Sequence, residues 1–102
     1  MGYGSENLII KQKLEDAIEY SYCVFQHFPK AERFTLVADL KRSQIKILQL
    51  VIRANKSREK IPVLREIDTE LEVFRTLVRL SFTLKFIAPK QYENISIRFN
   101  EF

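Results

Sequence analysis

Basic side chains gather along one predicted helix face in the middle of the chain. Arg42, Lys46 and Arg53 fall within about 40° of one another when the segment is projected as a helix. The stripe continues into a polar connector through three more cations, Lys56, Arg58 and Lys60. Regular positive charge suits the phosphates of a nucleic-acid backbone and gives affinity without base readout. The spacing therefore indicates sequence-tolerant nucleic-acid binding, and the alternative is a solvated face without a ligand.

The charge balance favours the same part of the chain. The formal net charge is +4, and residues 29–60 carry nine basic and three acidic side chains. Residues 1–28 carry two basic and four acidic side chains, and the remaining segments are balanced. A local excess produces a stronger field than the same charge spread evenly. An anionic partner is expected to meet the chain there.

A second pair of cations lies in the third segment of the chain. Arg75 and Arg79 share one helix edge with Asp68 and Glu72. Carboxylates three or four residues away can form a ladder of ion pairs that contributes only about 0.2–0.5 kcal/mol per pair. The two arginines are therefore candidates for nucleic-acid binding, with an ion-pair ladder as the alternative.

Catalytic and metal-binding constellations are missing from the sequence. The chain has one histidine, His27, and one cysteine, Cys23, four residues apart. A cysteine–histidine nucleophile also needs an orienting group, and a structural zinc site needs four ligands. We therefore expect no enzymatic activity, no metal and no cofactor, and we interpret Cys23 as a small core or boundary residue.

Prolines divide the chain into four segments with helical periodicity. Both glycines lie at positions 2 and 4, and the prolines are Pro29, Pro62 and Pro89. Proline is tolerated in the first turn of a helix and pushes the preceding residue out of the helical region. Apolar residues in each segment recur at i, i+3, i+4 and i+7. The sequence predicts an all-α, up-down-up-down antiparallel four-helix bundle in one domain, residues 1–102, with helices at about 8–27, 29–55, 62–86 and 89–102.

The second predicted helix is apolar over roughly 180° of its circumference, wider than one interface needs. Its predicted core stripe comprises Phe34, Val37, Ile45, Leu48 and Ile52. The surplus favours a contact with another copy or a partner, through Leu36, Leu40, Ile47 and Leu50. The alternative is that this helix packs against two neighbours within the chain.

The last predicted helix is too short to cover its neighbours. Residues 89–102 reach only about 20 Å at 1.5 Å per residue. Leu8, Ile9, Ile61 and Leu64 are therefore expected to lose their cover. Another chain covers them, or the N-terminal residues fold across, or this end of the bundle frays.

The sequence gives a coarse expectation of where the protein works. No stretch approaches the ~18 consecutive apolar residues of a membrane span, and the start of the chain does not resemble a signal peptide. A single cysteine fits a reducing compartment. We expect a cytoplasmic protein without membrane contact.

Residues 28–36 carry a family resemblance, because they read FPKAERFTL. This stretch resembles the FPK-x-x-RF-x-L motif that opens the second helix of Avd-like four-helix-bundle proteins, the accessory variability determinants of diversity-generating retroelements. The similarity continues through residues 50–55, 64–68, 71–80 and 89–93 and covers most of the chain from about residue 10 onward. The related ribosomal-RNA intervening-sequence proteins share the bundle and similar motifs, and they stay an alternative.

The resemblance implies a ring-shaped homopentamer that binds RNA and DNA and assists a reverse transcriptase in cDNA synthesis during mutagenic retrohoming. It assigns nucleic-acid binding to four matching cations, Lys30, Arg33, Arg75 and Arg79. Family members continue helix four into a glycine-tryptophan ending, whereas this sequence ends in Asn100-Glu101-Phe102. The oligomer size is therefore open, and the rival function is a purely structural, oligomeric interaction protein.

Overall fold

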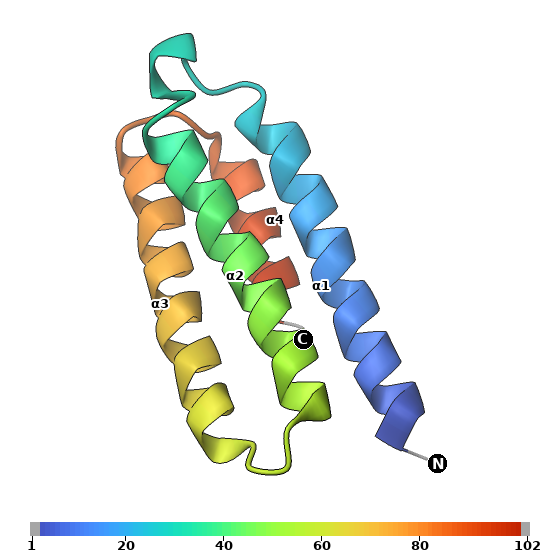
Figure 1. Ribbon diagram of the computed structural model, residues 1–102. Helices are drawn as coiled ribbons and strands as arrows, with labels where there is room; N and C mark the ends of the chain where they lie inside the picture. Colours follow the sequence, from blue (N-terminus) through green and yellow to red (C-terminus); the bar gives the residue numbers. More distant parts are fainter. Residues whose placement is uncertain (1–2, 101–102) are drawn as a thin grey trace.

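The computed structural model describes residues 3–100, which form four α-helices and one short 3-10 helix (Figure 1). The α-helices are α1 (Tyr3–Phe25), α2 (Leu36–Lys56), α3 (Ile61–Thr83) and α4 (Pro89–Asn100), and the 3-10 helix η1 spans Lys30–Glu32. The part of the chain so described contains no strand. The prediction of an all-α four-helix bundle with a short fourth helix is confirmed.

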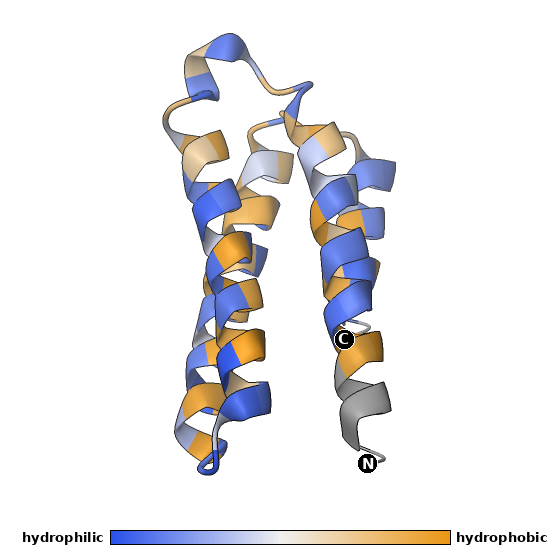
Figure 2. Cartoon of the chain, turned by 45° about the vertical axis from the view of Figure 1, so that its right-hand side comes forward, coloured by the Kyte–Doolittle hydropathy of each residue, from blue (hydrophilic) through white to orange (hydrophobic). Residues whose placement is uncertain are grey.

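The four helices form a ring of antiparallel neighbours. α1 and α3 each lie beside both α2 and α4. Figure 2 shows hydrophobic and hydrophilic residues alternating along each helix, as expected when one face is buried and the other is exposed. None of the described helices has the length and hydropathy needed to cross a membrane.

The connection between α1 and α2 is longer than predicted. Pro29 is the N-cap of η1, and the amide of Glu32 donates to the Pro29 carbonyl at 2.9 Å. The chain then leaves helical geometry at Thr35, whose φ is −116° and ψ is −98°. The second helix therefore begins at Leu36, and its predicted start at Pro29 is wrong. Proline permits one helical turn but does not ensure that the turn continues.

The end of α3 uses a left-handed residue that is not glycine. The amide of Lys85 donates to the Phe82 carbonyl, and the amide of Phe86 donates to the Ser81 carbonyl, both at 2.9 Å. These two bonds form a Schellman cap, with Lys85 in the left-handed position at φ 67°. α3 therefore ends at Thr83, short of the predicted residue 86, and no glycine marks this end in the sequence.

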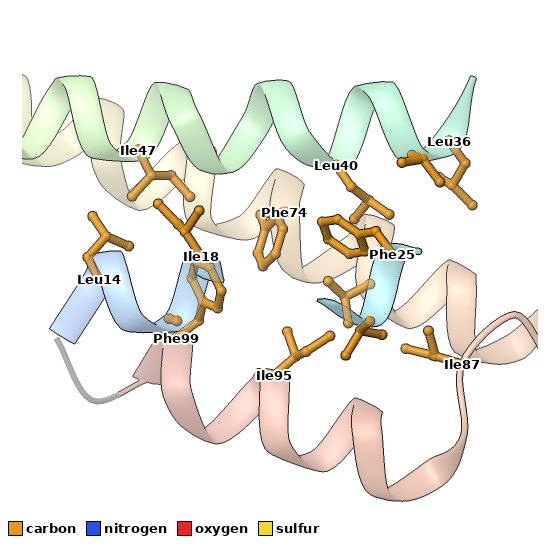
Figure 3. Packing of buried hydrophobic residues seen from close by; sticks show 14 of the residues in the cluster. Leu14, Ile18, Phe25, Leu36, Leu40, Ile47, Phe74, Ile87, Ile95 and Phe99 are labelled. Carbon is orange, nitrogen blue, oxygen red and sulfur yellow. The ribbon is translucent and has the colours of Figure 1, made fainter. Parts of the chain in front are cut away.

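The core contains side chains from all four helices. Phe74 of α3 is fully buried, and its ring centroid lies 4.3 Å from that of Phe99 of α4, which is 2% exposed. Figure 3 shows Leu40 and Ile47 of α2 projecting into the same core. The periodic apolar residues of α1 and α4 supply the rest of this core, among them Leu14, Ala17, Ile18, Phe25, Ile95 and Phe99.

On α2, the predicted interface residues belong to the core, whereas only part of the predicted core stripe does. The four residues assigned to an oligomer or partner interface, Leu36, Leu40, Ile47 and Leu50, are at most 8% exposed and belong to the chain's own core. In contrast, Phe34 of the predicted core stripe is 85% exposed. The interface prediction is wrong because α1 and α3 cover α2 from two sides. The later start of α2 also places Phe34 outside the helix.

The short α4 leaves one end of the bundle open (Figure 1). Leu8, Ile9, Ile61 and Leu64 are all more than half exposed, as predicted. A cleft of about 330 Å³ lies there, with Ile10, Leu71 and Phe99 in its wall. α1 runs as a helix from Tyr3, so residues from this point onward do not fold across the opening.

The core also contains one unsatisfied amide. Gln44 of α2 is fully buried, and neither its Oε1 nor its Nε2 has a hydrogen-bond partner among the described residues. The buried serines differ, since Ser21 donates to the Ala17 carbonyl and Ser81 to the Leu77 carbonyl, each at 2.8 Å. An unsatisfied buried polar group lowers the stability of the fold.

Two phenylalanines test the observed burial. We expect Phe74→Ala to lower the free energy of unfolding by about 3–5 kcal/mol, because it removes a fully buried ring. Phe34→Ala should change it by less than about 0.5 kcal/mol, because that ring is already in solvent. Urea unfolding of the two variants measures both values. Similar losses in both would contradict the placement of Phe34.

The amide of Gln44 gives a second prediction. Gln44→Met keeps the length of the side chain and removes both unsatisfied atoms, so we expect a gain of about 1–2 kcal/mol in the free energy of unfolding. Gln49→Met, at an exposed position of the same helix, is the matched control and should change little. Thermal unfolding measures the difference, and a destabilised Gln44→Met protein would show that the amide is satisfied.

Candidate nucleic-acid interface

All ten cations predicted to bind nucleic acid lie at the surface. Each is exposed in the structure. The fold does not gather them into one patch, because they occupy α2, the α2–α3 connector, α3 and the α1–α2 connection. The four groups differ in how far neighbouring side chains compensate their charge.

The stripe on α2 is largely compensated. Arg42 forms an ion pair with Asp39 one turn earlier, and Arg53 forms one with Glu66 of α3. Lys46 lines a shallow cleft together with Arg65, Glu66 and Glu70. Both partners of each ion pair are more than half exposed, so solvent screens these interactions. Sequence reasoning missed Glu66 and Glu70 because they meet α2 only through the pairing of two helices. It also missed Asp39, which the i, i+3 spacing to Arg42 could have revealed.

In the connector, one of the three cations has a structural role. The Nζ of Lys60 donates to the carbonyls of Ala54 at 2.7 Å and Ser57 at 3.2 Å. An ammonium group at this place satisfies carbonyls at the C-terminal end of α2 and interacts favourably with the helix dipole. Lys56 and Arg58 are exposed, and no hydrogen bond or ion pair of their side chains is found among the described residues.

On α3, the ion-pair ladder does not form. Arg75 and Arg79 line a shallow cleft with Asp68, Glu72 and Thr76, but none of these carboxylates is within ion-pair distance of either guanidinium. Arg75 instead donates to Oδ1 of Asn100 at 2.8 Å. The two arginines therefore stay available to a ligand, although acidic side chains share their surface.

The α1–α2 connection holds cations that have no carboxylate in their cleft. Lys30 and Arg33 line a cleft of about 380 Å³ together with Lys41 of α2, and no carboxylate belongs to its lining. No ion pair within residues 3–100 involves any of these three. Glu32, the nearest carboxylate in sequence, accepts a hydrogen bond from the Thr35 hydroxyl at 2.8 Å. Sequence reasoning missed Lys41, whose Nζ lies 4.7 Å from the centre of the Tyr22 ring.

The candidates for catalytic chemistry are not assembled into a site. Cys23 is exposed, which corrects its interpretation as a core or boundary residue: it lies on the outer side of α1. No hydrogen bond joins Cys23 to His27, which is also exposed. Within residues 3–100, no three His, Cys, Asp or Glu side chains come together where they could hold a metal ion.

Comparison with known proteins identifies the family. Residues 8–102 match the bAvd-like family, and this range includes residues of all four helices. No curated protein and no solved structure matches the chain. The match agrees with the resemblance at residues 28–36 and with the helical bundle observed. The chain therefore belongs to the bAvd-like family.

Proposed function

We propose that this protein is a non-enzymatic accessory subunit that binds nucleic acid and works with the reverse transcriptase of a diversity-generating retroelement. Its role would be to assist cDNA synthesis in mutagenic retrohoming. The family match over residues 8–102 carries the proposal, because Avd-like proteins are a non-catalytic accessory family. The ligand is RNA, with DNA as a second substrate, and the site of action is the cytoplasm.

The surface supports an electrostatic mode of binding. All ten candidate cations are exposed, and the protein has a formal net charge of +4. Lysine and arginine on rigid helices contact phosphates and release counterions, which gives affinity for many sequences. Because these cations are distributed over four surfaces, they suit a long or folded ligand better than a short one.

Self-association is part of the proposal. The open end of the bundle exposes several large apolar side chains next to the cleft that contains Leu71 and Phe99. A second copy could cover this end, and a pentamer is the assembly that the family suggests. The same observation favours one alternative, a structural interaction protein that forms an oligomer and does not bind nucleic acid.

Salt dependence distinguishes the two functions. We expect the protein to bind a structured RNA, with an affinity that falls steeply as the salt concentration rises. Lys46→Gln/Arg53→Gln should reduce the slope of log K against log salt by about two, since each lost phosphate contact removes about 0.9 from it. Fluorescence anisotropy at several salt concentrations measures both effects.

A matched control is available on α1. Lys11→Gln/Lys13→Gln removes the same charge from a helix outside the predicted stripe, and it should leave most of the slope intact. Equal effects of the two double variants would show that only net charge matters. A wild-type protein without RNA affinity at low salt would refute the proposed function and favour the structural oligomer.

The proposed polymerase partner requires its own experiment. We expect a diversity-generating retroelement reverse transcriptase from the same genome, co-expressed with a tagged copy of this protein, to co-purify with it. The protein should also raise the yield of template-primed cDNA. A reverse transcriptase from an unrelated retroelement is the control. Equal retention of both polymerases, or a cDNA yield independent of the protein, would contradict the partnership.

A further inference from the structure

One aromatic ring in the α1–α2 connection is left in solvent. The side chain of Phe34 is 85% exposed, more than any other large apolar side chain of the described residues. Burying a phenylalanine contributes about 1.5–3 kcal/mol to folding, and this ring contributes almost none of it. Figure 1 shows the connection projecting beyond the ends of the neighbouring helices. The fold does not use this ring for packing within the chain.

The ring follows directly on cations whose cleft contains no carboxylate. Arg33 precedes Phe34 in the chain, and with Lys30 and Lys41 it lines the cleft of about 380 Å³. Phe25, Phe28 and Val37 supply the apolar part of the same wall. Cations in the same short connection as an exposed ring favour an anionic ligand with a flat apolar part, because the charged part can contact the cations and the flat part the ring.

The second connection at this end of the bundle adds to the positive charge. The rings of Phe28 and Phe86 lie 5.6 Å apart between centroids, so the α1–α2 and α3–α4 connections are adjacent. The two connections, residues 26–35 and 84–88, contain three cations, Lys30, Arg33 and Lys85, against the single carboxylate of Glu32. These two connections therefore carry an excess of positive charge, and Asp39 in the adjoining first turn of α2 is paired with Arg42.

We propose that this corner binds a single-stranded segment of nucleic acid, with one base stacked on Phe34 and the flanking phosphates at Lys30, Arg33 and Lys41. Aromatic platforms combined with basic grooves are the usual means of holding single strands, because every unpaired base offers a flat face. The bases of a duplex are stacked on each other and cannot take this place. The inference rests on the proposed function and deepens it by naming the form of the ligand and the surface that holds it.

The test compares strand forms. Fluorescence anisotropy would measure the affinity of the full chain for a labelled oligouridine and for a labelled RNA duplex of equal length. We expect Phe34→Ala to weaken binding of the single strand about tenfold, with the duplex affinity and the salt slope unchanged. Lys30→Gln/Arg33→Gln should weaken binding and also reduce the single-strand salt slope by about 1.4, since each phosphate contributes about 0.7.

Two further variants separate stacking from other effects. Val73→Ala removes an apolar side chain that is 42% exposed in the middle of α3, away from both ends of the bundle, and it should bind like the wild type. Phe34→Trp should retain the affinity, and since the chain has no tryptophan of its own, quenching of its emission by the oligonucleotide reports the stack directly. Unfolding curves for each variant show that the bundle is intact.

The outcomes distinguish this inference from the proposed function. Unchanged single-strand affinity in Phe34→Ala, with RNA binding present in the wild type, overturns the inference and leaves the function standing. The same holds if single strand and duplex lose affinity equally. A changed oligomer mass in light scattering without a change in affinity assigns the ring to a protein contact and also overturns the inference. A wild type that binds no nucleic acid overturns both.

Discussion

The fold depends on the burial of α2 from two sides. Its apolar arc is wider than a single neighbouring helix can cover, and α1 and α3 each cover one part of it. Leu40 and Ile47 are fully buried as a result, while Leu50, Ala54 and Val63 form a smaller cluster between α2 and α3. This arrangement fixes which part of α2 remains in solvent. It also brings the carboxylates of α3 beside the cations of α2, so packing of the core decides the charge pattern of the surface.

The short fourth helix gives the bundle two unequal ends. At the end with the α1–α2 and α3–α4 connections, aromatic side chains such as Phe28 and Phe86 close the core. At the other end, α4 stops before its neighbours, and apolar side chains of α1 and α3 face solvent. One end is therefore closed, and the other is open and apolar, while each has a connection rich in cations, since Lys56, Arg58 and Lys60 lie beside the open end. Two such surfaces on one small bundle are suited to different kinds of partner.

Proline and periodicity predicted the helices, but not how each helix ends. α4 begins at Pro89 as predicted, and α3 begins at Ile61, one residue before its proline. The error at Pro29 arose because a proline permits a first helical turn without requiring a second. The end of α3 was missed because a lysine occupies the left-handed position where glycine is common. Which side of the wide arc on α2 faces the core depends on helix pairing, and a single helix projection does not contain this information.

The cations of the candidate site were predictable from the sequence, but the carboxylates that compensate them across helices were not. A sequence gives the positions of cations and their neighbours along one helix, and on this basis the stripe on α2 was the leading candidate. Compensation across helices, as between Arg53 and Glu66, depends on a contact between residues distant in the chain. Connections differ from helices in this respect, because no neighbouring helix face supplies Lys30 or Arg33 with a carboxylate. Positive charge on helices of a bundle therefore reflects packing as well as ligand binding. In a connection that no helix face covers, the same positive charge points more directly to a ligand. Phe34 lies in such a connection, and its exposure points the same way.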